Sequence, residues 1–206
     1  MNQKQAKSDA TRAKILSAAE KEFSDKGFFG ARIDEIARTA GVNKRMIYAH
    51  FESKEGLYQQ ILLTTYKRVA ECESNFYIDN LEPTEAIRNV VHTYFRFLKE
   101  TPSFVRLLMW ENLNGAKSLF GDEVRKLKAP TLDYISSEIR RGKAMGIFRD
   151  DVDEYQVSLS IQSFSFSYFS NIHTLSEVFS RNMSDPDEIL ARAEFVSDVI
   201  LKHLLK

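Results

Sequence analysis

The feature that most constrains this chain is a pair of short amphipathic helices joined by a tight turn, predicted for residues 34–51. Gly41 is suited to the left-handed conformation in which many helices end, and Asn43 can cap the helix that follows. Val42 can pack on Ile47, which fixes the direction in which the chain enters the second helix. Two such helices with a glycine-containing turn form a helix-turn-helix. The first helix has its apolar residues at helical spacing, namely Ile33, Ile36, Ala37 and Ala40.

The second of these helices has an outward face that suits the major groove of DNA. At ~100° per residue, and with Ile47 and Phe51 turned to the core, one arc of the helix points away from the protein. Arginine pairs well with guanine, and small or flexible apolar side chains can touch a thymine methyl group. Cations at the flanks suit phosphates. The outward arc carries Arg45, Met46, Tyr48 and Ala49, and its flanks carry Lys44 and His50.

Further phosphate contacts are expected at the starts of two other helices. Residues 1–7 are polar and basic and are expected to form a loose arm, after which Ser8 caps a helix that stops at Gly27. Thr11 and Arg12 would then lie in its first turn, where a hydroxyl, a guanidinium and free backbone N–H groups can meet a phosphate. Lys54 follows a cap at residue 53 and lies at the positive end of a fourth helix, where an anion is favoured.

These residues carry a family resemblance. Residues 27–57, and GVNKRMIYAHFESKEGL in particular, resemble the DNA-binding domain of the TetR/AcrR family of bacterial transcriptional regulators. Three positions depart from the common pattern: Ala31 and Arg32 replace frequent threonines, and Arg45 replaces a common glycine. The missing hydroxyls remove one expected phosphate contact and the usual cap of the second helix, whereas Arg32 and Arg45 remain candidates for DNA binding. The matching positions are Ile36, Ala37, Ala40, Gly41, Val42, Asn43, Ile47, Tyr48, His50, Phe51, Lys54 and Leu57.

Composition places the chain among ordinary soluble proteins. It has 206 residues, of which 43% are hydrophobic and 28% charged. It lacks an apolar run near the roughly 20 residues of a membrane span, and its N-terminus lacks the apolar core of a signal peptide. We therefore expect a cytoplasmic protein without membrane contact. The single cysteine, Cys72, excludes an internal disulfide and a cysteine-based metal cluster.

The distribution of charge favours a DNA-facing N-terminal end. The net charge of the whole chain is zero, but residues 1–56 hold eleven Lys and Arg residues against eight acids. This excess of positive charge has the sign expected of a surface that faces phosphates.

The sequence predicts an all-α fold with two domains. A three-helix DNA-binding domain with the helix-turn-helix is expected at residues 1–56, and an effector-binding and dimerisation bundle at residues 57–206. A long helix from residue 54 to about 74 would link them. The remaining sequence keeps helical spacing and lacks strand alternation, which gives about nine helices in total.

The last two long helices are candidates for a dimer interface. The helix expected from residue 154 to about 173, capped by Asp153, is apolar around most of its circumference and rich in serines that permit close helix approach. We expect it to form a four-helix interface with the last helix, capped by Asp185, and the same pair in a second copy. The alternative is an internal helix pair. The interface candidates are Ile161, Phe166, Tyr168, Ile172, Val196, Val199 and Ile200.

A pocket for a small apolar or aromatic effector is expected between the helices of the second domain. The resemblance implies such a molecule, and pockets between bundled helices are often apolar with a few polar groups. The alternative is that these side chains are simply core. The candidates are His92, Tyr94, Phe95, Arg106, Trp110, Phe164 and Phe169.

The expected function is a sequence-specific transcriptional regulator, a homodimeric repressor that a small effector releases from a palindromic operator. Catalysis, a metal and a cofactor are not expected, because the histidines lack HExxH spacing and the chain has no GxSxG elbow or phosphate-binding glycine loop. One alternative is a helical protein-interaction or ligand-binding module that does not bind DNA. Another is a small helical enzyme, for which the sequence offers no clustered polar site.

Overall fold

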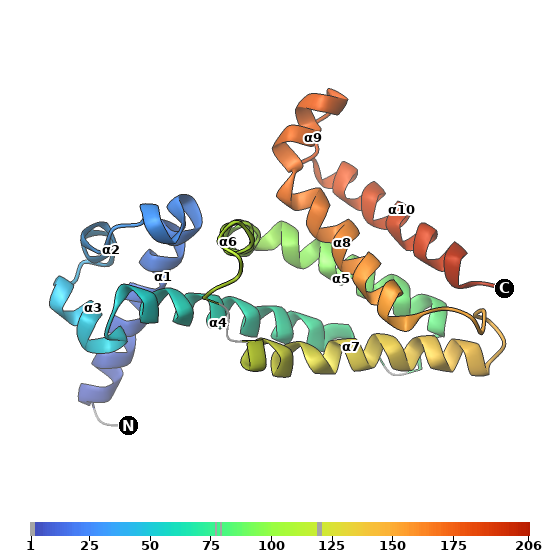
Figure 1. The fold of residues 1–206 in the computed structure, drawn as a ribbon, viewed down its shortest axis with the longest axis horizontal. Coiled ribbons are helices and arrows are strands. Elements are labelled where there is room, and N and C mark those ends of the chain that lie inside the picture. Colours follow the sequence, from blue (N-terminus) through green and yellow to red (C-terminus); the bar gives the residue numbers. More distant parts are fainter. Residues whose placement is uncertain (1–2, 77, 79, 119–120) are drawn as a thin grey trace. The chain divides into compact units, whose positions relative to one another are not determined.

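The expected all-α class is confirmed by a computed structural model, which describes residues 3–76, 78, 80–118 and 121–206 (Figure 1). In these residues the only β-type pairing is an isolated bridge between Phe148 and Leu205. None of the described helices has the length and apolar character needed to cross a membrane. In chain order the elements are α1 (Gln3–Gly30), α2 (Ile33–Ala40), α3 (Lys44–Phe51), α4 (Lys54–Glu73), the 3-10 helix η1 (Ser74–Phe76), α5 (Pro83–Glu100), α6 (Pro102–Leu113), α7 (Gly121–Ala144), α8 (Glu154–Ser170), α9 (Ile172–Phe179) and α10 (Pro186–Leu204).

Two helix boundaries differ from expectation. The first helix begins at Gln3, so residues 3–7 are helical and do not form the loose arm expected there. The helix expected to run to about residue 173 ends at Ser170, and α9 follows as a separate short helix. The described residues therefore form ten α-helices where about nine were expected.

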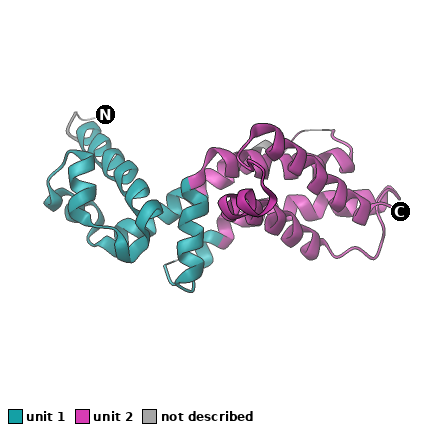
Figure 2. Ribbon diagram, turned by 90° about the horizontal axis from the view of Figure 1, so that it is seen from above, with its two compact units in different colours: residues 1–66, 103–124 teal, residues 67–102, 125–206 magenta. Residues whose placement is uncertain are grey.

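The chain divides into two compact units (Figure 2). The first comprises Met1–Tyr66 and Ser103–Val124, and the second comprises Lys67–Pro102 and Arg125–Lys206. Helix α4 continues from the first unit into the second, as expected of the long fourth helix. Helix α6 packs with the first unit, although the sequence assigned everything after residue 56 to the second domain. The functional boundary at residue 56 remains a prediction.

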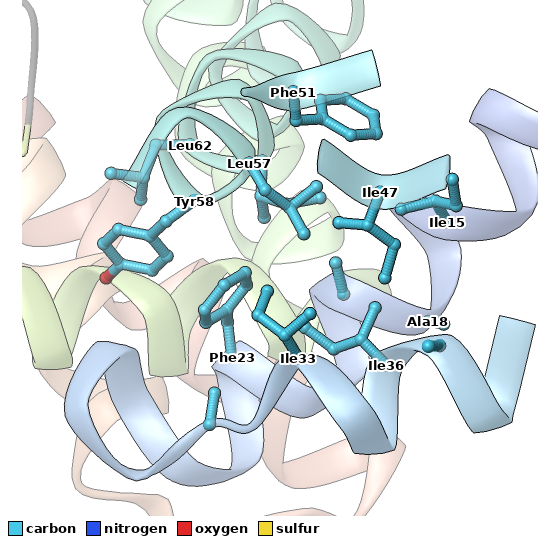
Figure 3. Packing of buried hydrophobic residues seen from close by; sticks show 14 of the residues in the cluster. Ile15, Ala18, Phe23, Ile33, Ile36, Ile47, Phe51, Leu57, Tyr58 and Leu62 are labelled. Carbon is cyan, nitrogen blue, oxygen red and sulfur yellow. The ribbon is translucent and has the colours of Figure 1, made fainter. Parts of the chain in front are cut away.

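The first unit is built around one apolar core (Figure 3). Ile33, Ile47 and Leu57 come from α2, α3 and α4 and point into the same interior space (Figure 3). The ring of Phe23 on α1 meets the ring of Tyr58 edge to face, with centroids 4.9 Å apart. Burial of each such side chain contributes about 1.5–3 kcal/mol, so the core fixes the helix-turn-helix on α1 and α4.

A kink in α1 lies directly beneath a tryptophan of α6. Gly27 interrupts the helix with φ 67° and ψ 178°, at the position where the sequence predicted a stop. The indole of Trp110 covers this glycine so closely that a Cβ there would lie 2.7 Å from its Cδ2 atom. The indole N–H also donates to the carbonyl of Ser24 at 3.3 Å. Helix α6 is thus fixed to α1 within the first unit.

The second unit is organised around α5, which packs against α8 and α10. Most of the apolar face of α5 is buried, and the ring of Phe95 lies 5.9 Å from that of Tyr168 and 5.7 Å from that of Phe169 on α8. On the surface, Arg88 of α5 binds Glu194 of α10 at 2.8 Å. The core therefore holds α8 and α10 on one central helix.

Candidate nucleic-acid interface

The turn between α2 and α3 forms as the sequence predicts. Gly41 adopts the left-handed conformation, with φ 65° and ψ 36°, and its N–H donates to the carbonyl of Arg38 at 3.2 Å. The Asn43 side chain accepts from the backbone N–H of Arg45 at 2.9 Å, which is the expected N-cap. Val42 packs against the apolar core. Local capping therefore sets the angle at which α3 leaves the turn.

The outward face of α3 is free for contact, as predicted. Ile47 and Phe51 are buried, and His50 at the flank is half-buried. Of the two larger apolar side chains on the outward face, Met46 is 40% and Tyr48 is 42% exposed. Exposed apolar side chains grouped on one short helix indicate a binding surface. The exposed positions of α3 are Lys44, Arg45, Met46, Tyr48 and Ala49.

The two cations at the start of α3 differ in their surroundings. The Lys44 ammonium lies 2.9 Å from the Asp34 carboxylate, and this hydrogen bond raises the pKa of Lys44. The Arg45 guanidinium has neither a hydrogen bond nor an ion pair within the described residues. Arg45 can therefore approach a base edge without first breaking an internal contact.

Thr11 and Arg12 lie elsewhere in their helix than expected. Since α1 begins at Gln3, these residues lie well inside it, and their backbone N–H groups are not available to a phosphate. The Thr11 hydroxyl donates to the carbonyl of Lys7 at 2.9 Å. The Arg12 guanidinium lies 5.3 Å from the ring centre of Phe51, so it is held beside the end of α3. Any phosphate contact from these residues would have to come from their side chains alone.

Arg32 and Lys54 take on structural tasks that the sequence did not reveal. Arg32 occupies the N-cap of α2 without a capping side-chain bond, as expected from the missing hydroxyl, and its backbone N–H donates to Glu22 at 3.2 Å. The Lys54 ammonium donates to the carbonyl of Ala31 at 2.6 Å and lies 4.8 Å from the ring centre of Phe28. Lys54 therefore ties α4 to the connection between α1 and α2, which a pattern of helix starts cannot indicate.

The expected effector residues do not form one cluster. Arg106 and Trp110 belong to the first unit, where the Arg106 guanidinium lies 3.4 Å from Asp25 and Trp110 covers the kink in α1. Their part in an effector pocket remains a prediction. The other five candidates, His92, Tyr94, Phe95, Phe164 and Phe169, do belong to the second unit.

Within the second unit these five side chains have different surroundings. Phe95 and Phe169 pack on each other in the core. His92 lies 3.3 Å from Glu194, measured from Nε2 to Oε1. Phe164 is 38% exposed and lines a surface groove. Only Tyr94 meets a buried charged group, because its hydroxyl donates to Glu73 at 2.8 Å.

The dimer candidates also divide between core and surface. Ile161, Tyr168, Val196 and Ile200 are mostly buried within their own unit, although Tyr168 also lines a surface groove, and their place in an interface remains a prediction. Phe166 and Ile172 are half-buried, and Val199 is exposed. The exposed apolar side chains of α8, α9 and α10 are Tyr155, Leu159, Phe164, Val178, Phe179, Leu190, Phe195 and Val199.

A largely apolar groove of about 510 Å³ lies among these three helices. Phe164 of α8, Phe179 of α9 and Phe195 of α10 line it, and Arg181 and Glu188 add an ion pair of 2.5 Å near its edge. The sequence missed this groove because it predicted no separate helix at residues 172–179.

A buried charged cluster in the second unit was also missed. Glu73 at the end of α4 is 3% exposed, and its carboxylate binds Lys128 and Thr131 of α7 as well as Tyr94 of α5. Burial lowers the pKa of Lys128 and, together with Glu73, raises that of Tyr94. No local motif joins residues this far apart in the chain, so only the fold brings them together.

Comparisons with known proteins agree on the family. Residues 15–61 match the model for bacterial regulatory proteins of the tetR family, and residues 83–200 match a tetracyclin repressor-like C-terminal domain. The transcriptional repressor NicS of Pseudomonas putida is 35% identical over 197 residues, which is 95% of this chain and 93% of NicS. The regulator RutR of Escherichia coli is 32% identical, over 58% of this chain and 56% of RutR.

Solved structures agree on the fold. The crystal structure of SCO4942 from Streptomyces coelicolor matches with a TM-score of 0.73 at 24% identity, over 94% of this chain and 98% of that one. The regulator FadR from Bacillus subtilis, solved in complex with stearoyl-CoA, matches with a TM-score of 0.70 at 15% identity, over 93% and 98%. At these identities the likeness concerns the fold alone.

Proposed function

Because the chain belongs to the TetR family of bacterial regulatory proteins, we propose that it is a homodimeric repressor that a small effector releases from a palindromic operator. It is a helix-turn-helix transcriptional regulator that binds DNA, in a family of regulators and not of enzymes. The repressor assignment is supported by NicS, a named repressor that matches nearly the whole chain. The protein would act in the cytoplasm, where it meets the chromosome.

The observation that carries the proposal is the outward face of α3. Arg45, Met46, Tyr48 and Ala49 lie exposed on a helix whose opposite side, through Ile47 and Phe51, is fixed in the core. A recognition helix needs this combination, because base readout requires a fixed backbone and side chains that are free to enter the groove. Arg45 is the best candidate for direct readout, since its guanidinium has a free fork for guanine N7 and O6.

A second copy of the chain would bind at α8, α9 and α10. Phe164, Phe179 and Phe195 are exposed there around an apolar groove, and monomers rarely leave apolar patches of this kind in solvent. A two-fold dimer presents two α3 helices, which must match half-sites about 34–36 Å apart. The proposed operator is therefore a palindrome with one reading helix in each half.

Release by an effector follows from linkage. A molecule that binds the protein better when the reading helices do not match the operator must weaken DNA binding by the same factor. By the family resemblance, the movement passes through α4, which begins at Lys54 beside α3 and ends at Glu73 in the second unit. FadR, a protein of the same fold, was solved with an acyl-CoA, which supports an apolar small molecule as effector.

Selection of duplexes from a random pool, followed by sequencing, tests the proposal. We expect a palindrome that binds with strong salt dependence. Arg45→Ala should cost about 1–3 kcal/mol and relax preference at one base pair per half-site. Arg45→Lys should keep the charge but also lose that preference, because lysine lacks the planar fork. Arg38→Ala is the control, since Arg38 is an exposed arginine of α2 paired with Glu35.

Two results would count against the proposal. A protein that binds no duplex at any salt concentration would be a helical binding module for another partner. An Arg45→Ala variant with unchanged base preference would mean that this face of α3 does not read the groove.

A further inference from the structure

In the buried cluster around Glu73, the carboxylate is held by neutral donors as well as by the Lys128 ammonium. The Glu73 carboxylate accepts from the Tyr94 hydroxyl at 2.8 Å through Oε1 and from the Thr131 hydroxyl at 2.6 Å through Oε2. These neutral donors come from α5 and α7 and would hold the carboxylate without Lys128. The Lys128 ammonium also donates to Oε1, but it is carried on a long flexible stem, and the whole Lys128 side chain is 15% exposed, against 3% for that of Glu73. Glu73 is therefore the fixed charge and Lys128 the removable one.

The position taken by the Lys128 ammonium has the features of a binding site for an organic cation. It contacts a carboxylate oxygen of Glu73 and lies 3.2 Å from the Tyr94 hydroxyl. It also lies 5.2 Å from the centre of the Tyr94 ring, within the range of a cation–π contact. Phe76 extends the aromatic wall, with its ring 5.6 Å from that of Tyr94 and 6.3 Å from that of Tyr134.

Stability alone does not account for this arrangement. Desolvation of two charges offsets much of their attraction, and well-packed apolar residues often replace a buried ion pair without loss of stability. A lysine that occupies the site can leave it by turning its ammonium back into water, where its charged form is better hydrated. Burial lowers the pKa of Lys128, which means that the charged ammonium is disfavoured in its present position. For a ligand cation with an apolar body, burial of that body would offset part of this desolvation cost.

We propose that Glu73, Tyr94 and Thr131 form an effector subsite for a protonated amine on an apolar or aromatic body, and that Lys128 occupies this subsite until such a ligand displaces it. The inference rests on the proposed function, in that it names the chemical class of the effector. Glu73 is the last residue of α4, so a ligand that exchanges its counter-ion acts directly on the helix that continues into the first unit.

Three ligands of similar size and different charge test the proposal on the full-length protein by calorimetry. Benzylammonium should bind, whereas benzyl alcohol and benzoate should bind much more weakly. Glu73→Gln should weaken benzylammonium binding on the order of tenfold or more, the effect of losing a charge-assisted hydrogen bond. Equal binding of all three ligands, or a preference for benzoate through Lys128, would overturn the proposal.

A variant in which the Lys128 side chain is truncated at Cβ gives a second test. Lys128→Ala leaves Glu73 without its counter-ion, so the variant should unfold at lower temperature than the wild type, and n-butylammonium should restore part of the loss. Lys126→Ala is the control, because Lys126 is an exposed lysine of the same helix with no partner among the described residues. A loss in Lys128→Ala that n-butylammonium does not restore, or equal responses of both variants, would contradict the proposal. The wild-type titration decides the matter even if Lys128→Ala does not fold.

Operator binding separates this proposal from the proposed function. Suppose that the protein binds its selected operator, and that the affinity for the operator is lowered by benzoate but not by benzylammonium. The proposed function as a regulator would then hold, and the cation subsite would be wrong. If no duplex is bound at all, the proposed function is wrong, and amine binding in calorimetry still reports on the subsite.

Discussion

The contact between Gly27 and Trp110 gives a quantitative prediction for the first unit. Gly27→Ala places a side chain at φ 67° and ψ 178°, a region that is nearly exclusive to glycine and costs of order 1–3 kcal/mol for other residues. The new methyl group would also lie 2.7–3.0 Å from three atoms of the indole ring. Moving the ring away costs roughly 1–3 kcal/mol more, as for other overpacked sites. We expect Gly27→Ala to lower the free energy of unfolding by about 2–6 kcal/mol, the sum of the two contributions.

Gly41→Ala separates the two contributions. Gly41 also has a positive φ of 65°, but a Cβ there would meet no atom within 4 Å. Its replacement should therefore cost only the left-handed strain of roughly 1–2 kcal/mol. In a Trp110→Ala background, Gly27→Ala should likewise cost only the backbone strain, because the clash with the indole is absent. A double-mutant cycle measures this difference as a coupling energy.

Urea unfolding at a fixed protein concentration is the assay, because any dimer makes stability concentration-dependent. The chain has a single tryptophan, so the fluorescence of Trp110 reports on the first unit, and circular dichroism serves the Trp110→Ala background. Equal costs for Gly27→Ala and Gly41→Ala, or a coupling energy near zero, would refute the close approach of the indole to the kink.

Two further predictions concern pH and assembly. Burial raises the pKa of Tyr66 to about 12, so its neutral form stabilises the fold at neutral pH and this contribution is lost as pH rises from about 10. Between about pH 10 and 12 the free energy of unfolding should fall less steeply with pH in Tyr66→Phe than in the wild type, by up to about 1.4 kcal/mol per pH unit. Urea unfolding at several pH values measures this slope, and an equal slope in both proteins would contradict the prediction. Phe195→Glu should convert the proposed dimer to monomers in sedimentation, whereas Phe29→Glu, at a phenylalanine of the first unit that is more exposed still, should not. A dimer that survives Phe195→Glu would remove that residue from the interface.

The helix-turn-helix was predictable because its determinants are local. Gly41 and Asn43 act within three residues of their own positions, and the periodicity around Ile47 gives the buried side of a short helix directly. The exposed face of α3 follows from that periodicity. The contacts of Lys54 did not follow, because its carbonyl acceptor at Ala31 lies 23 positions earlier in the chain.

The contacts that the sequence did not predict have a common physical origin in long-range packing. Helix α6 is apolar around much of its circumference, so its sequence does not say which neighbours it packs against, and the contact of Trp110 with α1 was not predicted. The same holds for α8, where apolar residues on all sides left the choice between core and interface open. Ile161 and Tyr168, which the sequence assigned to an interface, are buried in their own unit, whereas Leu159, which it did not single out, is exposed.

The path of the chain limits how this protein can be divided. The backbone passes between the two units three times, after Tyr66, after Pro102 and after Val124. Leu107, part of the core beneath the reading helix, therefore reaches it only after the chain has visited the other unit. A gene fragment that ended after α4 would encode the whole recognition motif yet leave a hole in its hydrophobic interior. The helix-turn-helix with α1 and α4 is consequently not a complete folding unit, and transferring it to another regulator would require α6 to be transferred as well.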